Sequence, residues 1–348
     1  MVLLARELKA RGLRSEVLVM FDGGPREAAL REAGVPIVHL GFLTFSRHGW
    51  RAVPAAVRGC ARMLRYLRQT RPDVLHAHLF QCYVAAAALA RMAGVRVLVA
   101  GRHSAPDRLS APKRILDRRA SRRADYLITL SKAMARLENE VIRVPTRKIG
   151  VVYSGLPPTA FTQQPPAELR TDLPVILSIG NLQPWKGHSV LLGAAALLRQ
   201  RGLDCTIVII GEGPERHALT QQAHAFNLDL RLLGARFDVG RWLARADLVA
   251  HPSLSEALGI AVLEAMAAGV PVVGSAVGGI TELLTGRGVL VPPGDAEALA
   301  DGLERLLRDP AHGARLSAAA QAWSREHVTA EVSVDRHLTI YNRLLTSR

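Results

Sequence analysis

The 348-residue sequence predicts an α/β protein of two doubly wound domains, each built on a parallel sheet. Apolar strand patterns alternate with amphipathic helix patterns along nearly the whole chain, which indicates parallel sheets covered on both faces. A chain of this length is typical of two domains. The alternation is interrupted once, at the proline-rich segment 154–174, which we expect to be the linker between the domains.

The first half of the chain holds the expected succession of elements. Helix patterns cover residues 2–10, 50–68, 81–92, 112–123 and 132–141, and strand patterns cover 16–21, 35–40, 72–78, 95–100, 124–130 and 149–153. A doubly wound domain normally opens with a strand and a glycine-rich turn before its first helix. Because the sequence begins within a helix, we expect that strand to be missing from the first domain, residues 1–155: either the domain tolerates the loss or the true start lies upstream.

The second half repeats the alternation in residues 156–325, which we expect to form the second domain. Strand patterns cover 174–180, 205–211, 230–234, 247–251, 271–273 and 289–291, and helix patterns cover 187–201, 214–226, 238–244 and 296–307, with further helices around Glu264 and after Gly278. Residues 326–348 are expected to form a C-terminal helix that packs back on the first domain. The two domains are expected to face a cleft.

The positive charge of the chain is concentrated in its first half. The net charge is +15, and residues 1–155 hold 28 Lys and Arg against 11 Asp and Glu. This asymmetry indicates an acidic partner, which could be nucleic acid, an anionic lipid or a phosphorylated substrate. A generally basic, arginine-rich proteome is the alternative explanation of the total charge, but it explains the asymmetry poorly.

Cysteines and apolar segments restrict the class of protein further. Cys60, Cys82 and Cys205 are scattered and odd in number, which favours a reducing compartment and argues against a disulfide framework or a zinc site. The longest apolar run, 82–90, is too short to span a bilayer. We expect no secretion signal, because charged residues fall within the first helix.

The stretch 251–284 carries the strongest chemical signal. Glu256 lies in a turn before Gly259 and Ile260, which lead into a helix that holds Glu264. A helix N-terminus offers unpaired N–H groups and a positive dipole end to an anion, whereas carboxylates suit hydroxyl donors. An anion flanked by hydroxyls describes a sugar, a diphosphate and a ribose. The alternative is a capping carboxylate and a solvated helix residue, although the apolar neighbours of Glu264 predict a mostly buried helix.

Two glycine-containing turns join strand to helix in the second half. Lys186 stands one residue before a helix, which is an unfavourable place for a solvated cation and a favourable one for a residue that meets a phosphate. The turn formed by Gly211, Glu212, Gly213 and Pro214 is a weaker signal, because a tight turn alone explains its glycines.

Histidines and a basic helix are the candidates in the first half. We expect His76 and His78 to point to opposite faces of their strand, with His78, nearer the loop, in the cleft. His103, at the end of the next strand, is a weaker candidate. The helix 112–123 is either a solvated face or a surface for an anionic membrane. Its basic residues, interrupted only by Asp117, are Lys113, Arg114, Arg118, Arg119, Arg122 and Arg123.

Together these motifs resemble glycosyltransferase family 4, retaining enzymes of the GT-B fold. The matching motifs are Glu256-x7-Glu264 with the following Gly278-Gly279-x-x-Glu282, Gly180-x-Leu182-x-x-x-Lys186-Gly187, Gly211-Glu212-Gly213-Pro214, Asp73-Val74-Leu75-His76-Ala77-His78 and Val152-Tyr153-Ser154-Gly155. The likeness covers nearly the whole chain, and the motifs of the second half are the more specific. The resemblance implies two Rossmann-like domains that face a cleft.

The resemblance also assigns roles to residues of the second half. Glu256 and the amides of Gly259 and Ile260 would hold the donor sugar and its diphosphate. Glu264 would bind the ribose. Lys186 would neutralise the leaving diphosphate, so that electrostatic stabilisation of the leaving group becomes the main catalytic contribution.

The remaining roles are divided between the two halves. Asn181, Gly211 and Gly213 would complete the donor site, although the family usually has arginine where Asn181 stands. His78 would contact the sugar near the reacting carbon. His103 and the basic helix would lie on the side of the acceptor or the membrane.

The activity that the resemblance implies is that of a metal-independent hexosyltransferase. It would move a sugar from a nucleotide-diphosphate sugar, with no cofactor, to a lipid-linked or glycan acceptor. No Asp-x-Asp pair occurs in the sequence, as in metal-independent enzymes of this fold. We expect a role in bacterial lipopolysaccharide, exopolysaccharide or glycolipid synthesis, in the cytoplasm or peripherally at the inner face of the cell membrane.

Two other hypotheses remain open at this point. A catalytically weak or inactive relative, acting as a sugar-binding or partner protein, is suggested by the absent first strand and by Asn181. A nucleic-acid binder rests on charge alone, without a recognised module or interleaved aromatic residues, and we therefore expect no nucleic-acid partner.

Overall fold

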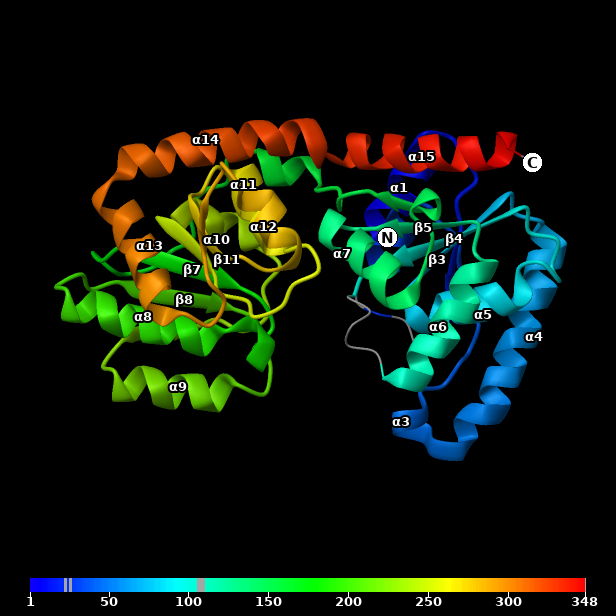
Figure 1. Cartoon of the computed structure of the whole chain (residues 1–348), viewed down its shortest axis with the longest axis horizontal. Coiled ribbons are helices and arrows are strands. Elements are labelled where there is room, and N and C mark those ends of the chain that lie inside the picture. Colours follow the sequence, from blue (N-terminus) through cyan, green and yellow to red (C-terminus); the bar gives the residue numbers. More distant parts are fainter. Residues whose placement is uncertain (22–23, 25–26, 105–109, 348) are drawn as a thin grey trace. The chain divides into compact units, whose positions relative to one another are not determined.

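The computed structural model describes residues 1–21, 24, 27–104 and 110–347, which form two compact units. The first unit comprises Met1–Gly155 and the C-terminal segment Ala330–Arg348, and the second comprises Leu156–Thr329. Each unit has an apolar core of its own. Both are built from helices that cover parallel strands (Figure 1), as the alternating sequence pattern predicts.

The strands of the first unit form two separate parallel sheets. One pairs β1 (Val17–Val19) with β2 (Ile37–His39), and the other has the order β3-β4-β5-β6. The strands of this second sheet are β3 (Val74–His78), β4 (Val97–Arg102), β5 (Tyr126–Thr129) and β6 (Ile149–Val151). Within the described residues α1 (Val2–Ala10) precedes β1, and no further strand joins either sheet.

The helices of the first unit cover these sheets. They are α1, α2 (Glu27–Glu32), α3 (Phe45–His48), η1 (Gly49–Arg51), α4 (Ala52–Thr70), α5 (Phe80–Leu89), α6 (Ala111–Arg123), α7 (Lys132–Leu137), η3 (Glu138–Ile142), η4 (Thr146–Lys148) and α15 (Ala330–Thr346). In α4, Ala55, Met63 and Leu67 recur at helical spacing and are buried, whereas its arginines are exposed. The sequence pattern predicts α4 but not α2 or α3, which are too short to show a period.

A buried ion triad links three elements of the first unit. Arg102, at the end of β4, donates to both carboxylate oxygens of Asp117 on α6, at 2.7 and 2.8 Å, and to Glu138 at 2.8 Å. Burial and the nearby carboxylate of Glu138 raise the pKa of Asp117 to about 8, so one proton and one guanidinium balance the two carboxyl groups. Asp117 therefore points into the core, and the charged residues on the exposed side of α6 are all basic.

The second unit contains one six-stranded parallel sheet with the order β12-β11-β10-β7-β8-β9. Its strands are β7 (Val175–Ile179), β8 (Thr206–Ile210), β9 (Asp229–Leu232), β10 (Leu248–His251), β11 (Val272–Ser275) and β12 (Val289–Val291). The order reverses between β7 and β10, because the chain first adds strands on one side of β7 and then on the other. Doubly wound sheets bind their ligands beyond the carboxyl ends of the strands at such a reversal.

The helices of the second unit are η5 (Pro158–Phe161), η6 (Pro184–Lys186), α8 (His188–Gln200), α9 (Arg216–Ala225), α10 (Val239–Arg245), α11 (Ile260–Ala268), α12 (Gly278–Leu284), α13 (Ala296–Arg308) and α14 (Pro310–His327). The proline-rich segment 154–174, expected as a linker, belongs to this unit from Leu156 onward, and its backbone is bonded to the unit although most of its residues are exposed. The Leu156 N–H donates to the carbonyl of Val328 at 2.7 Å, and the Ala167 N–H donates to that of Arg241 at 2.9 Å. The prolines of this segment thus stand in backbone that is irregular but hydrogen-bonded to the rest of the unit.

Candidate functional site

The strand reversal of the second unit brings together the loop after β7 and the loop after β10. Lys186, the last residue of η6, forms an ion pair with Glu256 in the turn after β10. Their side chains are only 18% and 17% exposed. Two residues that are 70 positions apart in the sequence therefore meet at the position where this class of sheet binds its ligands.

Two further side chains surround the carboxylate of Glu256. His251 Nε2, at the end of β10, lies 3.4 Å from Glu256 Oε2 and 3.2 Å from Ser253 Oγ. Burial raises the pKa of Glu256, but the hydrogen bond with His251 and the positive charge of Lys186 outweigh burial and bring this pKa to about 2. Glu256 is therefore ionised at neutral pH and can accept hydrogen bonds from hydroxyl groups. His251 had no predicted role, although its place at the carboxyl end of a buried strand was an available signal.

Helix α11 begins at Ile260, shortly after Glu256 in the sequence. Gly259 caps it in the left-handed region, with φ of 93°, and a glycine has no side chain to bond the first N–H groups. The side chain of Ile260 is 49% exposed. Glu264 lies four residues further on, hence on the same face of the helix, and is partly buried, whereas Val262 and Leu263 are fully buried. This face of α11 can hold an anion at its start and a hydroxyl donor one turn later.

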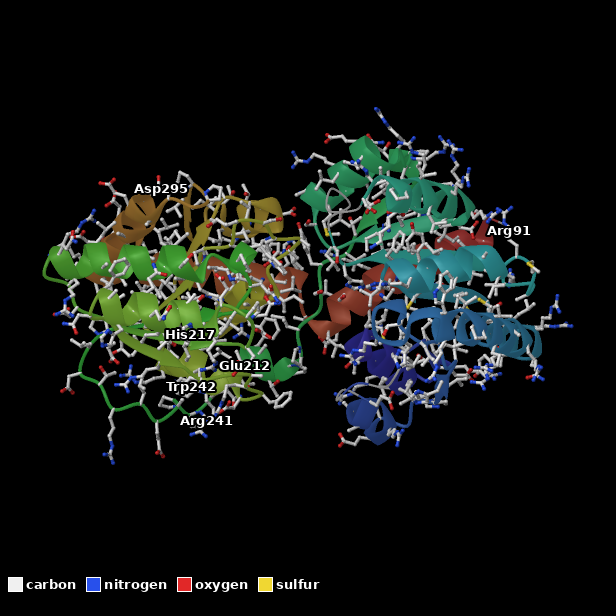
Figure 2. All side chains as sticks on the ribbon, turned by 90° about the horizontal axis from the view of Figure 1, so that it is seen from below. Arg91, Glu212, His217, Arg241, Trp242 and Asp295 are labelled. Atoms are coloured by element: carbon white, nitrogen blue, oxygen red, sulfur yellow. The ribbon has the colours of Figure 1, made fainter. Side chains whose placement is uncertain are left out.

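Glycines allow the neighbouring loops to approach one another. A Cβ on Gly211, in the turn after β8, would lie 1.9 Å from the carbonyl oxygen of Gly180, and one on Gly278 would lie 1.8 Å from that of Glu256. Glu212, labelled in Figure 2, belongs to the same turn as Gly211 and Gly213, and its carbonyl accepts from the Leu182 N–H at 2.9 Å. The loop after β7 also carries Asn181, whose side chain is exposed. The candidate donor residues therefore lie together beyond the carboxyl ends of the strands.

In the first unit, histidines cluster at the ends of β3 and β4. The ring centroids of His76 and His78 are 4.1 Å apart, and His78 Nδ1 lies 2.9 Å from His103 Nε2. The prediction that His76 and His78 face opposite sides is wrong, because strand side chains alternate with a period of two and residues two apart share a face. Burial lowers the pKa of all three imidazoles, that of His103 to about 4.

Two residues of α15 complete this histidine cluster. His76 Nδ1 lies 2.6 Å from the hydroxyl oxygen of Tyr341, and the rings of His76 and His337 are 5.6 Å apart. Neither of these residues of α15 was predicted to lie at a site. No local signal could have found them, because the contact joins positions 265 residues apart.

A groove of about 430 Å³ runs between α5 and α6. Its residues are Val84, Ala87, Ala88, Leu116, Arg119, Ala120, Arg122 and Arg123. The floor is apolar and the charged residues in it are all arginines. Ile115 and Leu116 are 58% and 44% exposed on the same helix, and Arg91, labelled in Figure 2, follows α5. A surface that combines exposed aliphatic side chains with unopposed positive charge is typical of contact with anionic membranes.

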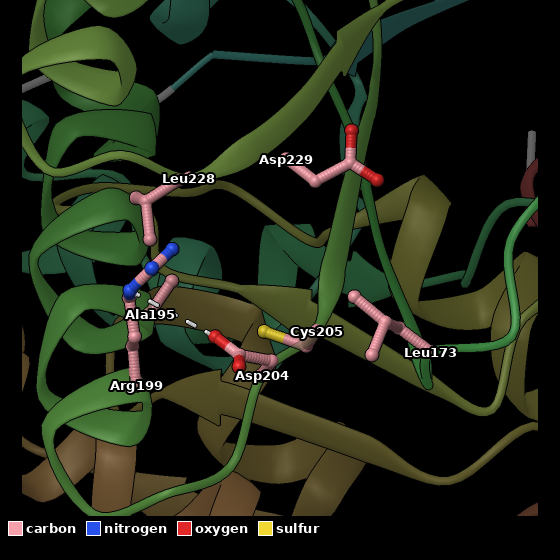
Figure 3. A pocket seen from close by; sticks show the side chains of 7 residues that line it. All are labelled: Leu173, Ala195, Arg199, Asp204, Cys205, Leu228 and Asp229. Atoms are coloured by element: carbon pink, nitrogen blue, oxygen red, sulfur yellow. Dashed lines mark ion pairs between the residues drawn. The ribbon is translucent and has the colours of Figure 1, made fainter.

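A second cavity, of about 240 Å³, lies at the amino ends of the strands of the sheet in the second unit (Figure 3). Cys205, one of its residues, directly precedes β8, and Asp229 begins β9, so this cavity is at the amino ends of the strands. Arg199 Nε lies 3.9 Å from a carboxylate oxygen of Asp204 within it. Lys186 and Glu256 lie beyond the carboxyl ends of the strands, where such sheets bind their ligands, so the position of this cavity at the amino ends argues against it as the ligand site.

Across residues 1–21, 24, 27–104 and 110–347, no three His, Cys, Asp or Glu residues are arranged to hold a metal ion. In the same ranges no helix combines the length and the apolar character that crossing a bilayer requires.

The sequence matches two family descriptions. Residues 161–323 match glycosyl transferases group 1, and residues 1–159 match glycosyltransferase family 4. The D-inositol 3-phosphate glycosyltransferase of Frankia alni is 31% identical over 355 residues, covering 91% of this chain and 87% of that protein. The chain therefore belongs to the family 4 glycosyltransferases.

Other curated relatives match over a shorter range. The D-inositol 3-phosphate glycosyltransferase of Salinispora tropica is 36% identical over 231 residues, which is 58% of this chain and 48% of that protein. The match thus spans about half the length of that relative. The alpha-D-kanosaminyltransferase of Streptomyces kanamyceticus is 36% identical over 162 residues, 43% of this chain and 42% of that protein.

Solved structures share the fold. Anabaena Alr3699/HepE, in complex with UDP and glucose, superposes with a TM-score of 0.83 at 23% identity, covering 98% of this chain and 94% of that one. Sucrose-phosphate synthase from Thermosynechococcus elongatus gives 0.83 at 19% identity, covering 99% and 92%. At such identities the likeness shows the fold alone, which is GT-B: two α/β domains with parallel sheets, as the sequence predicts.

We predict that Gly278→Ala displaces the Glu256 turn, because the added Cβ would overlap the carbonyl oxygen of Glu256. Gly202→Ala is the matched control: Gly202 also has a positive φ, of 77°, but nothing lies within 4 Å of its Cβ position. Both variants carry the backbone strain of about 1–2 kcal/mol. Urea unfolding should show a loss of stability for Gly278→Ala that exceeds that of Gly202→Ala by about 1–3 kcal/mol, because only Gly278→Ala adds an overlap to the strain. Equal losses in the two variants would contradict the close approach of Gly278 to Glu256.

Proposed function

We propose that this protein is a retaining glycosyltransferase that moves a sugar from a nucleotide-diphosphate sugar to an acceptor. The observation that carries the proposal is the Lys186–Glu256 ion pair at the strand reversal, beside the N-terminus of α11. A cation, helix amides and an ionised carboxylate in one place suit a diphosphate attached to a hydroxyl-rich ring. The Anabaena structures that share the fold contain UDP, and one contains UDP-glucose.

The donor is held by groups with separate roles in this proposal. The amides of Gly259 and Ile260 and the ammonium of Lys186 bind the diphosphate. Glu256 accepts hydrogen bonds from the sugar hydroxyls, and Glu264 accepts them from the ribose. Lys186 and the helix dipole act most strongly when charge builds up on the leaving diphosphate, so they lower the barrier rather than merely bind the ground state.

The transfer itself proceeds on one face of the sugar. The acceptor hydroxyl oxygen forms a bond to the anomeric carbon on the side from which the diphosphate leaves, and the anomeric configuration is retained. The bond between that carbon and the phosphate oxygen breaks, and its electron pair goes to the diphosphate. A phosphate oxygen takes the acceptor proton. His78 contacts the sugar near the reacting carbon. Neither a metal nor another cofactor takes part.

The first unit provides the acceptor side in this proposal. The basic surface of α6 and the groove beside α5 favour an anionic lipid-linked or envelope glycan acceptor and peripheral contact with an anionic membrane. His103 lies in the same unit, next to His78. The cellular role that fits such an acceptor is bacterial lipopolysaccharide, exopolysaccharide or glycolipid synthesis at the inner face of the cell membrane.

The same donor residues also suit a second candidate function. The protein would then be a catalytically weak relative that binds sugar nucleotides without transferring the sugar. The exposed Asn181, which cannot supply the positive charge of an arginine at this position, favours it. Binding of UDP-glucose without release of UDP, in the presence of membrane lipid extracts as acceptors, would support this candidate against the first.

We predict that Lys186→Ala and Glu256→Gln each lower the rate of UDP release from UDP-glucose by about 10²–10³-fold, the loss typical of a missing electrostatic contact to a leaving group. Arg201→Ala is the control, because Arg201 forms ion pairs with Asp301 and Glu304 in the same unit, far from the strand reversal. Rates are measured by a coupled assay for free UDP. Near-wild-type rates in either site variant would contradict the proposal.

A double substitution tests the membrane surface. Arg119→Glu with Arg122→Glu reverses two charges in the groove of α5 and α6, so binding to phosphatidylglycerol vesicles at low salt should fall at least about tenfold, at about 1 kcal/mol per basic residue. Arg241→Glu with Arg315→Glu changes the net charge equally on exposed residues of the second unit. Vesicle sedimentation measures both. Equal loss in the two proteins, or no loss in either, would refute a specific role of α6.

A further inference from the structure

The histidine cluster of the first unit contains two hydrogen-bonded pairs on one side of the sheet. Tyr341 of α15 pairs with His76 Nδ1 at 2.6 Å, and His103 Nε2 pairs with His78 Nδ1 at 2.9 Å. The imidazoles of His76 and His78 lie between these partners, with ring centroids 4.1 Å apart. Three elements that are distant in the sequence, β3, β4 and α15, thus contribute to the surroundings of His78.

Gly101 provides the space in which the two imidazoles face each other. It is the strand neighbour of His78 in the β3–β4 register. A Cβ at Gly101 would lie 2.6 Å from His78 Nδ1 and 2.8 Å from His76 Nε2. Both nitrogens therefore border the same small volume. His76 Nε2 is buried there and has no hydrogen-bond partner among the described residues.

The position of the protons follows from the tyrosine. Burial raises the pKa of Tyr341, so its hydroxyl keeps its proton at neutral pH. His76 is the one hydrogen-bond partner of this buried hydroxyl among the described residues, so the O–H has an acceptor only if it donates the hydrogen bond to His76 Nδ1. Neutral His76 must then carry its own proton on Nε2, which points into the space beside Gly101. His78 Nδ1 borders the same space, so a lone pair at this nitrogen avoids opposing that N–H. In this arrangement the lone pair accepts its one hydrogen bond from His103 Nε2–H.

We propose that Tyr341, His76 and His103 are positioning residues that hold His78 neutral, with Nδ1 as an acceptor and its proton on Nε2. His78 then presents a hydrogen-bond donor, not a base, to the oxygen atoms of its substrate. The inference rests on the proposed function only in naming a sugar as that substrate; the arrangement of protons does not depend on it. It also gives the C-terminal helix α15 a chemical role.

The test is a long-range ¹H–¹⁵N correlation spectrum of the full chain, labelled with ¹⁵N-histidine, at pH 7. His78→Gln identifies the His78 signals. The expected result is a neutral His78 protonated on Nε2, and Tyr341→Phe should shift the nitrogen signals of both His76 and His78. Tyr66→Phe, which removes a hydroxyl bonded to Glu16 in the same unit, should leave them unchanged. A His78 that is charged, protonated on Nδ1 or insensitive to Tyr341→Phe would overturn the inference.

A pair of substitutions at His103 serves if Tyr341→Phe does not fold. The amide of His103→Gln can still donate to His78 Nδ1, so the Nε2–H form should persist, whereas His103→Leu should give a mixture of both tautomers. The same tautomer in both variants would overturn the role of His103.

Kinetics separate this inference from the proposed function. With UDP-glucose, His103→Leu should lower kcat on the order of tenfold to hundredfold and leave KM nearly unchanged, because the residues of the second unit that hold the donor are intact. His103→Gln should restore most of the rate. Full activity of His103→Leu despite mixed tautomers would overturn the inference. Absence of UDP-glucose binding by the wild type would instead refute the proposed function, and the spectra would still decide the inference.

Discussion

The ion pair of Lys186 and Glu256 is the interaction on which the second unit is organised. It joins the loop after β7 to the loop after β10 at the one place where the strand order reverses. Either charge left alone in this largely buried setting would be costly, so each stabilises the other until a ligand replaces it. A diphosphate can take over the cation and hydroxyl groups can take over the carboxylate. The charges of the pair therefore balance each other, and both side chains are already positioned for the donor of the proposed reaction.

Close backbone contacts keep this pair in position. Gly278 lies against the backbone of Glu256, and Gly211 against that of Gly180, at distances that no side chain would permit. The Leu254 N–H also donates to the carbonyl of Trp185, beside Lys186, at 2.8 Å. The first unit follows a different plan, in which buried polar clusters around Arg102 and His76 fix the ends of β3 and β4. Rigid scaffolds of both kinds limit how far a functional side chain can move.

The sequence predicted the fold class well, and it placed Lys186 and Glu256 correctly in turns at strand ends, because both results depend on local patterns. Period-two and helical patterns located the strands and most helices, and turns at strand ends located Lys186 and Glu256. What it missed depends on contacts between distant segments. The inward orientation of Asp117 and the contact of Tyr341 with His76 have no local signature. The error on His76 and His78 was of another kind, since the strand period, correctly applied, places both on one face.

The most direct test of the account is a crystal structure of the protein with UDP. The account predicts the diphosphate at the N-terminus of α11, within hydrogen-bond distance of the Gly259 and Ile260 amides, with Lys186 moved from Glu256 to a phosphate oxygen and Glu264 on the ribose. UDP bound elsewhere, for example in the cavity beside Cys205, with the Lys186–Glu256 pair intact, would contradict it.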